Sequence, residues 1–163
     1  MPLLRNGHLV TDNPWIRLED DTDGTAQTVD TSQQDSPVMV SVRRFLELQA
    51  HATHNVSGVY LSPEDDVQLL ADHLHRIQLI VINFPTYTDG RGYSQARMLR
   101  EQFHFAGELR ASGDVRPDQL LFMARAGIDV FEFAEDPDEK QITQILSRFQ
   151  VNYQPSYALP VAG

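Results

Sequence analysis

Leu79-Ile80-Val81-Ile82-Asn83-Phe84 is the stretch of sequence that decides the fold. Its first four residues are apolar without alternation, which is typical of a strand covered on both faces in a parallel sheet. Four further runs of strand character follow Pro37, at residues 38–40, 58–61, 107–111 and 130–133. The sequence therefore predicts about five strands in this part of the chain.

Helical periodicity separates these strands. Val67, Leu70, Ala71 and Leu74 recur at helical spacing behind Ser62-Pro63, which reads as an N-cap followed by proline. Comparable patterns occupy residues 42–51, 96–103, 120–124 and 142–149. Strand–helix alternation favours right-handed βαβ crossovers, so the fold class is α/β with a mainly parallel sheet of about five βα units. A complete eight-unit barrel needs about 250 residues, so an open doubly wound sheet and a partial-barrel arrangement remain.

The first 36 residues have a different character. Residues 7–10 and 15–18, separated by Thr11-Asp12-Asn13-Pro14, predict a β-hairpin. Residues 19–36 hold six acidic side chains and no basic one, with too little apolar surface to offset the entropy of ordering. We therefore expect an N-terminal β-hairpin at 1–18, an acidic flexible linker at 19–36 and an α/β domain at 37–163.

Composition excludes several kinds of chemistry. The chain has no cysteine, so disulfides, thiol chemistry and an iron–sulfur cluster on thiolates are excluded. Lys140 is the only lysine, which argues against pyridoxal phosphate or a P-loop. The formal charge of −10 argues against nucleic-acid binding. Without an apolar run long enough to span a membrane or a secretory signal pattern, the expected location is cytoplasmic.

The loop after Phe84 is the first candidate site, because ligands bind beyond the carboxyl ends of parallel strands. Its glycines permit close approach of the backbone, and the helix that follows offers free N–H groups to an anion. A small oxyanion ligand is therefore expected on this segment. The candidate ligand-binding residues are Gly90, Arg91, Gly92, Tyr93, Ser94 and Arg97. The alternative is an ordinary glycine-containing turn with solvated arginines.

The next strand adds charged residues to the same edge. Glu108, Arg110 and Ser112 share one face of this strand, and a charge on a covered strand is costly unless it is paired. Arg110 therefore needs a ligand or a carboxylate, and the candidate carboxylates are Glu108, Asp89, Asp114 and Glu132. Arg110, Asp114 and Arg116 complete the candidate ligand-binding set. The alternative is an internal ion-pair network that fixes the order of the strands.

Other catalytic signals are weak. The six histidines do not form a His-Glu-x-x-His pattern, so no metal site is predicted. The sequence lacks the Gly-x-Ser-x-Gly pattern of a nucleophilic serine. If the protein is a small enzyme acting on a phosphorylated or carboxylated metabolite, Asp89 or Asp114 is the candidate acid or base.

Two long blocks resemble the signature of a bacterial family, the domain of unknown function 934. The first is Phe84-Pro85-Thr86-Tyr87-Thr88-Asp89-Gly90-Arg91-Gly92-Tyr93-Ser94-Gln95-Ala96-Arg97. The second is Gly107-Glu108-Leu109-Arg110-Ala111-Ser112-Gly113-Asp114-Val115, followed by Asp118-Gln119-Leu120 and Gly127-Ile128-Asp129-Val130-Phe131. The resemblance covers roughly residues 38–149.

This resemblance implies a role in sulfite reduction, because proteins of the family are often labelled probable oxidoreductases of that pathway and are encoded beside assimilatory sulfite reductase. It implies no catalytic residues. Since the chain lacks thiols, cluster ligands and a dinucleotide fingerprint, an electron carrier would have to be a non-covalently bound flavin or nicotinamide. The residues fit better an accessory protein that binds the reductase or an anionic ligand. A metabolite enzyme and a purely structural adaptor are the other hypotheses.

Overall fold

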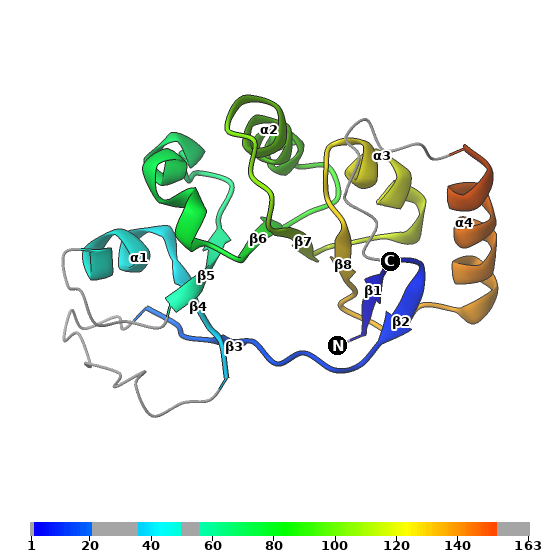
Figure 1. Cartoon of the computed structure of the whole chain (residues 1–163). Helices are drawn as coiled ribbons and strands as arrows, with labels where there is room; N and C mark the ends of the chain where they lie inside the picture. Colours follow the sequence, from blue (N-terminus) through cyan, green and yellow to red (C-terminus); the bar gives the residue numbers. More distant parts are fainter. Residues whose placement is uncertain (1, 21–35, 50–55, 153–163) are drawn as a thin grey trace.

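In the computed structural model, which describes residues 2–20, 36–49 and 56–152, one eight-stranded sheet curls into a half barrel (Figure 1). The strand order is β2-β1-β8-β7-β6-β5-β4-β3. Strands β3 to β8 run parallel, and β1 is antiparallel to both of its neighbours. The strands are β1 (Leu3–Arg5), β2 (His8–Val10), β3 (Ile16–Arg17), β4 (Val38–Ser41), β5 (Val56–Leu61), β6 (Leu79–Phe84), β7 (Glu108–Gly113) and β8 (Val130–Glu132).

The predicted alternation of strands and helices is confirmed from residue 38 onward. All five predicted strands are present, and the partial-barrel alternative is the one that the sheet adopts. The segment after β5 is a 3-10 helix rather than an α-helix, and α2 continues directly into a π-helix. The helices are α1 (Val42–Gln49), η2 (Val67–Arg76), α2 (Arg91–Arg97), η3 (Met98–Gln102), η4 (Pro117–Gln119), α3 (Leu120–Arg125) and α4 (Glu139–Asn152).

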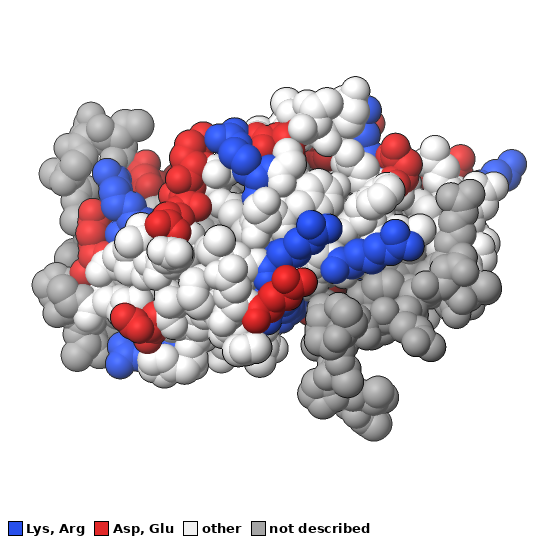
Figure 2. Space-filling view, turned by 90° about the horizontal axis from the view of Figure 1, so that it is seen from above, with Lys and Arg blue, Asp and Glu red and all other residues white. Residues whose placement is uncertain are grey.

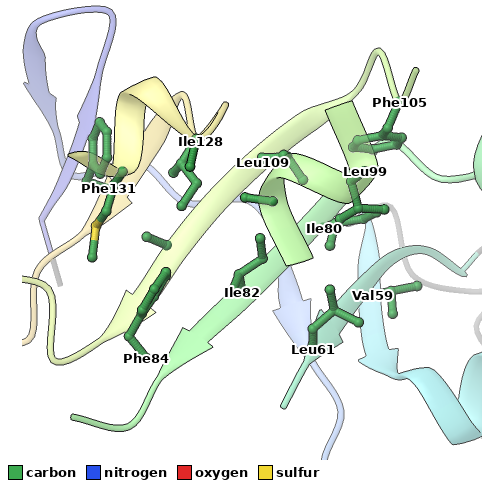
Figure 3. Packing of buried hydrophobic residues seen from close by; sticks show 14 of the residues in the cluster. Val59, Leu61, Ile80, Ile82, Phe84, Leu99, Phe105, Leu109, Ile128 and Phe131 are labelled. Carbon is green, nitrogen blue, oxygen red and sulfur yellow. The ribbon is translucent and has the colours of Figure 1, made fainter. Parts of the chain in front are cut away.

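The helices cover one face of the sheet, which we call the outer face (Figure 1). Apolar side chains from alternate strand positions point from this face toward the helices and form the main core (Figure 3). Ile80, Ile82 and Phe84 of β6 lie at its centre, and each is almost fully buried. Gly92 lets α2 approach this strand, because an added Cβ would lie 2.6 Å from the Phe84 ring. Such burial is the principal stabilisation of the half barrel.

The N-terminal segment corrects the sequence prediction. A hairpin exists, but it joins β1 to β2 through Asn6 and Gly7, both of which have positive φ. The predicted pairing of residues 7–10 with 15–18 is not formed. Ile16 and Arg17 instead form β3, which pairs with β4 at the opposite edge of the sheet. Short strands contain too few residues for their pattern to identify a distant partner.

Residues 11–15 connect these two edges, and we call this segment the strap. It crosses the inner face of the sheet, opposite the helices (Figure 1). Trp15 packs there against a small apolar cluster made of Met39, Tyr60, Leu79 and Val81. Gly58 provides the space for its indole, since an added Cβ would lie 2.7 Å from the ring. The inner face is therefore covered by the chain itself.

The predicted linker falls largely outside the described residues, which resume at Ser36. Asp20, at its start, accepts a hydrogen bond of 2.9 Å from the Ser41 hydroxyl. Among the described residues, helices long and apolar enough to cross a membrane are absent.

Candidate functional site

The loops after β6 and β7 form one surface at the carboxyl edge of the sheet, which we call the rim; it comprises Tyr87, Asp89, Arg91, Asp114 and Arg116. The two strands pair along their whole length, from Leu79 opposite Glu108 to Phe84 opposite Gly113, so their loops begin side by side. Asp114 joins the loops, because its backbone N–H donates to the Phe84 carbonyl and its carboxylate accepts from the Tyr87 N–H. Sequence reasoning placed these loops correctly at the same edge.

Arg91 and Asp89 form an exposed ion pair. The Arg91 Nε donates to both carboxylate oxygens, at 3.0 and 3.2 Å, and NH2 forms the closest contact at 2.6 Å. The Asp89 carboxylate also accepts from the Arg91 backbone N–H. These hydrogen bonds from Arg91 lower the pKa of Asp89 below its ordinary value. Asp89 is therefore ionised near neutral pH and holds the guanidinium in a fixed orientation.

Arg116 repeats this arrangement in the next loop. Its Nε donates to Asp114 at 3.0 Å and NH2 donates at 3.3 Å. The guanidinium also lies over the Tyr87 ring, with its central carbon 3.9 Å from the ring centroid. The hydrogen bond from Arg116 lowers the pKa of Asp114. Stacking and pairing together orient Arg116 without burying it.

The glycines and Tyr93 have mixed roles. Gly90 faces open space, since nothing lies within 4 Å of a Cβ added there, and Ser94 is exposed. Gly92 is buried against β6, and Tyr93 packs edge-to-face on Phe84 with ring centroids 5.3 Å apart. Burial raises the pKa of Tyr93. The structure therefore uses Gly92 and Tyr93 to pack α2, although both belong to the candidate ligand-binding set.

Arg110 does not lie on the rim. Its side chain is 0% exposed on the inner face, where NH2 donates to Glu108 at 2.8 Å and NH1 donates to the Asn13 side chain at 3.1 Å. Glu132 lies 3.9 Å from NH1. Two of the four carboxylates considered from the sequence are therefore its partners, as in the ion-pair alternative. Arg5 joins this network through Glu108 at 2.8 Å.

Arg97 is also separate from the rim. It is exposed and lies six residues beyond Arg91 in the same helix, about 9 Å along the axis. On the helical side of the molecule, basic and acidic side chains are interspersed among uncharged ones rather than gathered by sign (Figure 2). Within the described part of the chain, no group of three histidine, aspartate or glutamate residues could hold a metal ion.

Two residues that support the site went unrecognised in the sequence. The Tyr87 ring stacks against the Arg116 guanidinium, and the position of Tyr87 between two threonines gave no periodic signal. Gln95 donates from Nε2 to the Ser62 and Asp65 carbonyls, which ties the loop after β5 to α2. An amide side chain such as Gln95 shows no recognisable pattern until the loops are placed. Gln119 follows β7 at the edge that the sequence had already indicated, and its Nε2 donates to the Tyr87 carbonyl at 2.9 Å.

Comparison with known proteins assigns the chain to a family. Residues 58–162 match the family described as bacterial protein of unknown function, DUF934. The chain belongs to the DUF934 family. The DUF934 match begins within β5 and contains β6 to β8 and the whole rim, whereas β1 to β4 and the strap precede it. No curated protein matches the chain in sequence.

Proposed function

We propose that this protein is an accessory protein of assimilatory sulfite reduction, and that its rim binds sulfite reductase or a small oxyanion. The family resemblance supports the pathway. The rim supports the mode of action, because it presents two oriented guanidinium groups at the edge of a parallel sheet where ligands bind. The absence of cysteine from the chain argues against electron transfer through its own side chains.

The observation that carries the proposal is the unused capacity of the two exposed arginines. Each guanidinium has five N–H donors, and its aspartate engages only Nε and NH2. Within the described residues, NH1 of Arg91 and NH1 of Arg116 have no hydrogen-bond partner. A carboxylate, sulfite, sulfate or phosphate oxygen fits such donors in geometry and charge.

The charge of the chain bears on the encounter with a protein partner. A formal charge of −10 favours approach to a basic surface and makes association weaken as salt is added. The rim arginines are positively charged groups on this acidic protein, and they are available to acidic groups of the same partner. If both the net negative charge and the rim arginines contribute to binding, the affinity should fall as salt is added and also when the rim arginines are replaced.

The lowered pKa values of Asp89 and Asp114 disfavour the alternative of a metabolite enzyme that uses them in acid–base catalysis. An efficient general acid or base has a pKa near the working pH. Both carboxylates are instead held ionised by arginine, which weakens them as bases and removes them as acids. Their geometry serves orientation of the arginines better than proton transfer.

Thermal unfolding in the presence of oxyanions tests the small-ligand form of the proposal. A ligand that binds only the folded state raises the Tm by mass action, so millimolar sulfite, sulfate or phosphate should raise it. Arg91→Ala should remove most of this increment. Arg125→Ala is the matched control, because Arg125 is exposed and lies in the last turn of α3, whereas the rim lies where the loops leave β6 and β7. Equal increments in both variants would show a nonspecific salt effect.

A sulfide-formation assay tests the accessory role. The purified protein alone should oxidise neither NADH nor NADPH with sulfite as the acceptor. Added to the cognate sulfite reductase, it should change the rate of sulfide formation. A stoichiometric bound flavin with independent reductase activity would instead establish an oxidoreductase.

A further inference from the structure

The strap joins strands that stand at opposite ends of the sheet order. β2 is the first strand and β3 the last, so seven interstrand spacings separate them. At about 4.8 Å per spacing, the path across the sheet is about 34 Å. From Val10 to Ile16 the chain makes six Cα–Cα steps, which reach at most about 20–22 Å when extended. The strap is therefore too short to connect the edges of a flat sheet.

A half barrel resolves this mismatch. A semicircular arc of about 34 Å has a chord of about 22 Å, since neighbouring strands keep their 4.8 Å spacing around the curve. This chord equals the full reach of the strap. Figure 1 shows the strap running directly below the sheet from β2 to β3. The length of the strap and the curvature of the sheet thus agree when the strap is almost fully extended.

Two side chains fasten the strap, and each matches the part of the inner face beneath it. Asn13 accepts the hydrogen bond from buried Arg110 with Oδ1, which also accepts from the Trp15 N–H at 3.4 Å. The Trp15 indole covers the apolar half of the face around Gly58. The charged half holds two arginines and two glutamates, and its charges balance. The strap therefore covers the apolar half and contacts Arg110, the one of these four charged side chains that is 0% exposed.

We propose that the strap is a cross-brace of limiting length that sets the curvature of the sheet and keeps Arg110 on the inner face away from water. Its residues lie outside the DUF934 match, and the idea is independent of the proposed function. The segment before the match thereby supplies both outer edges of the sheet and the tie between them. A slack strap permits the edges to separate and hydrates Arg110.

A series of strap lengths tests this proposal. Gly-Ser is inserted once or twice between Thr11 and Asp12, both of which are exposed and precede the two fastening side chains. Trp15 is the only tryptophan in the chain, so its fluorescence reports directly on the seating of the strap. Its emission should shift to longer wavelength as residues are added. The same insertions between Asp136 and Pro137, in the connection from β8 to α4, are the control.

The distance between the sheet edges provides the second measurement. Because the chain lacks cysteine, spin labels attach only to the replacements His8→Cys and Ile16→Cys, at exposed positions on β2 and β3. Each inserted dipeptide should lengthen the label separation by several ångströms, up to about 7 Å. The control insertions should leave it unchanged. Circular dichroism identifies the variants that remain folded.

The two directions of length change distinguish a limiting strap from an ordinary connection. Deletion of Thr11 should lower the Tm more than insertion of two residues, because a strap at full reach cannot be shortened without losing an edge strand. An unchanged label separation and unchanged Trp15 emission after insertion would overturn the proposal. So would a deletion that is tolerated as well as an insertion, because curvature would then come from helix–sheet packing alone.

Discussion

Arg110 on the inner face and Arg91 and Arg116 on the rim have the same local pairing, yet they differ in surroundings. Each donates to a carboxylate two residues before it in the chain. The Arg110 side chain is 0% exposed, whereas the exposed fractions for Arg91 and Arg116 are 56% and 49%. The acid-x-arginine pattern, which all three sites share, therefore predicts only that an ion pair forms. Burial decides whether the pair stabilises the fold or remains available to a ligand.

Removal of the buried guanidinium should have the largest effect. Arg110→Met leaves Glu132 without its cation, Glu108 with Arg5 alone and Asn13 without its donor. Breaking a buried ion pair in this way costs about 3–5 kcal/mol. Urea unfolding measures the loss. The double variant Arg110→Met/Glu108→Gln should lose less than the sum of the single variants, because the two residues share one interaction. Additive losses would contradict the coupling.

The pKa of Asp129, a buried carboxylate paired with arginine, is shifted in the direction opposite to the pKa values of the rim aspartates. Desolvation raises its pKa from 3.8 to about 6, opposed by Arg100 at 3.4 Å and by the hydrogen bond from the Leu109 N–H. Its folded-state pKa exceeds the unfolded value, so its stabilising contribution is present below pH 3.8 and is lost as the pH rises through 6. A shift of this size corresponds to roughly 3 kcal/mol.

Asp129→Asn tests this sign. The amide keeps an acceptor for the Leu109 N–H but does not titrate. The free energy of unfolding of the wild type relative to the variant should fall between pH 4 and pH 6.5, then remain level. A wild-type advantage that grows with pH over this window would show that the ion pair with Arg100 outweighs desolvation.

The apolar half of the inner face should be sensitive to a single methyl group. Gly58→Ala places a Cβ 2.7 Å from both the Met39 Cβ and the Trp15 ring. Overpacking of this kind costs about 1–3 kcal/mol. A lowered Tm accompanied by altered Trp15 fluorescence is expected. Gly90→Ala is the control on the rim, where an added Cβ meets open space, and its Tm should be nearly unchanged.

The rim arginines should have the smallest effect on stability. Arg91→Ala and Arg116→Ala remove exposed ion pairs, which contribute little to folding because solvent screens them. Their unfolding curves should overlay that of the wild type, in contrast to Arg110→Met. A clear loss of stability in either variant would show that the rim pairs are structural.

The strands and helices from residue 38 onward could be predicted from the sequence, because each βα unit has its own strand and helix periodicity. Leu79 to Phe84 identified the central strand, and the requirement of Arg110 for a carboxylate followed from its place on that sheet. The strap could not be predicted. After the strap, β3 pairs with β4 at Val38, more than 20 residues away, and a two-residue strand has no period. Before it, β2 joins the sheet only through β1, whose other partner, Phe131 of β8, lies more than 120 residues away.

Part of the candidate site was likewise accessible. The loops that carry Asp89 and Arg91, and Asp114 and Arg116, leave the same edge of the sheet, as expected, and Asp114 joins them through the Tyr87 N–H. Arg110 was placed on one face of its strand with Glu108, and an internal ion-pair network was one of the two alternatives for it, but the sequence did not decide between that network and a ligand. The anchoring of Arg100 by the Phe105, Gly107 and Gly127 carbonyls also emerged only with the fold. Such contacts depend on tertiary placement rather than local pattern.

The most direct test of the account is the affinity of the protein for the cognate assimilatory sulfite reductase, measured by titration calorimetry at low and at moderate salt. We predict that the wild type binds, that added salt weakens binding, and that Arg91→Glu/Arg116→Glu loses at least tenfold in affinity while keeping its Tm. Arg125→Glu should bind like the wild type at each salt concentration. Equal affinities for the rim and control variants, or no binding by the wild type, would contradict the proposed role of the rim.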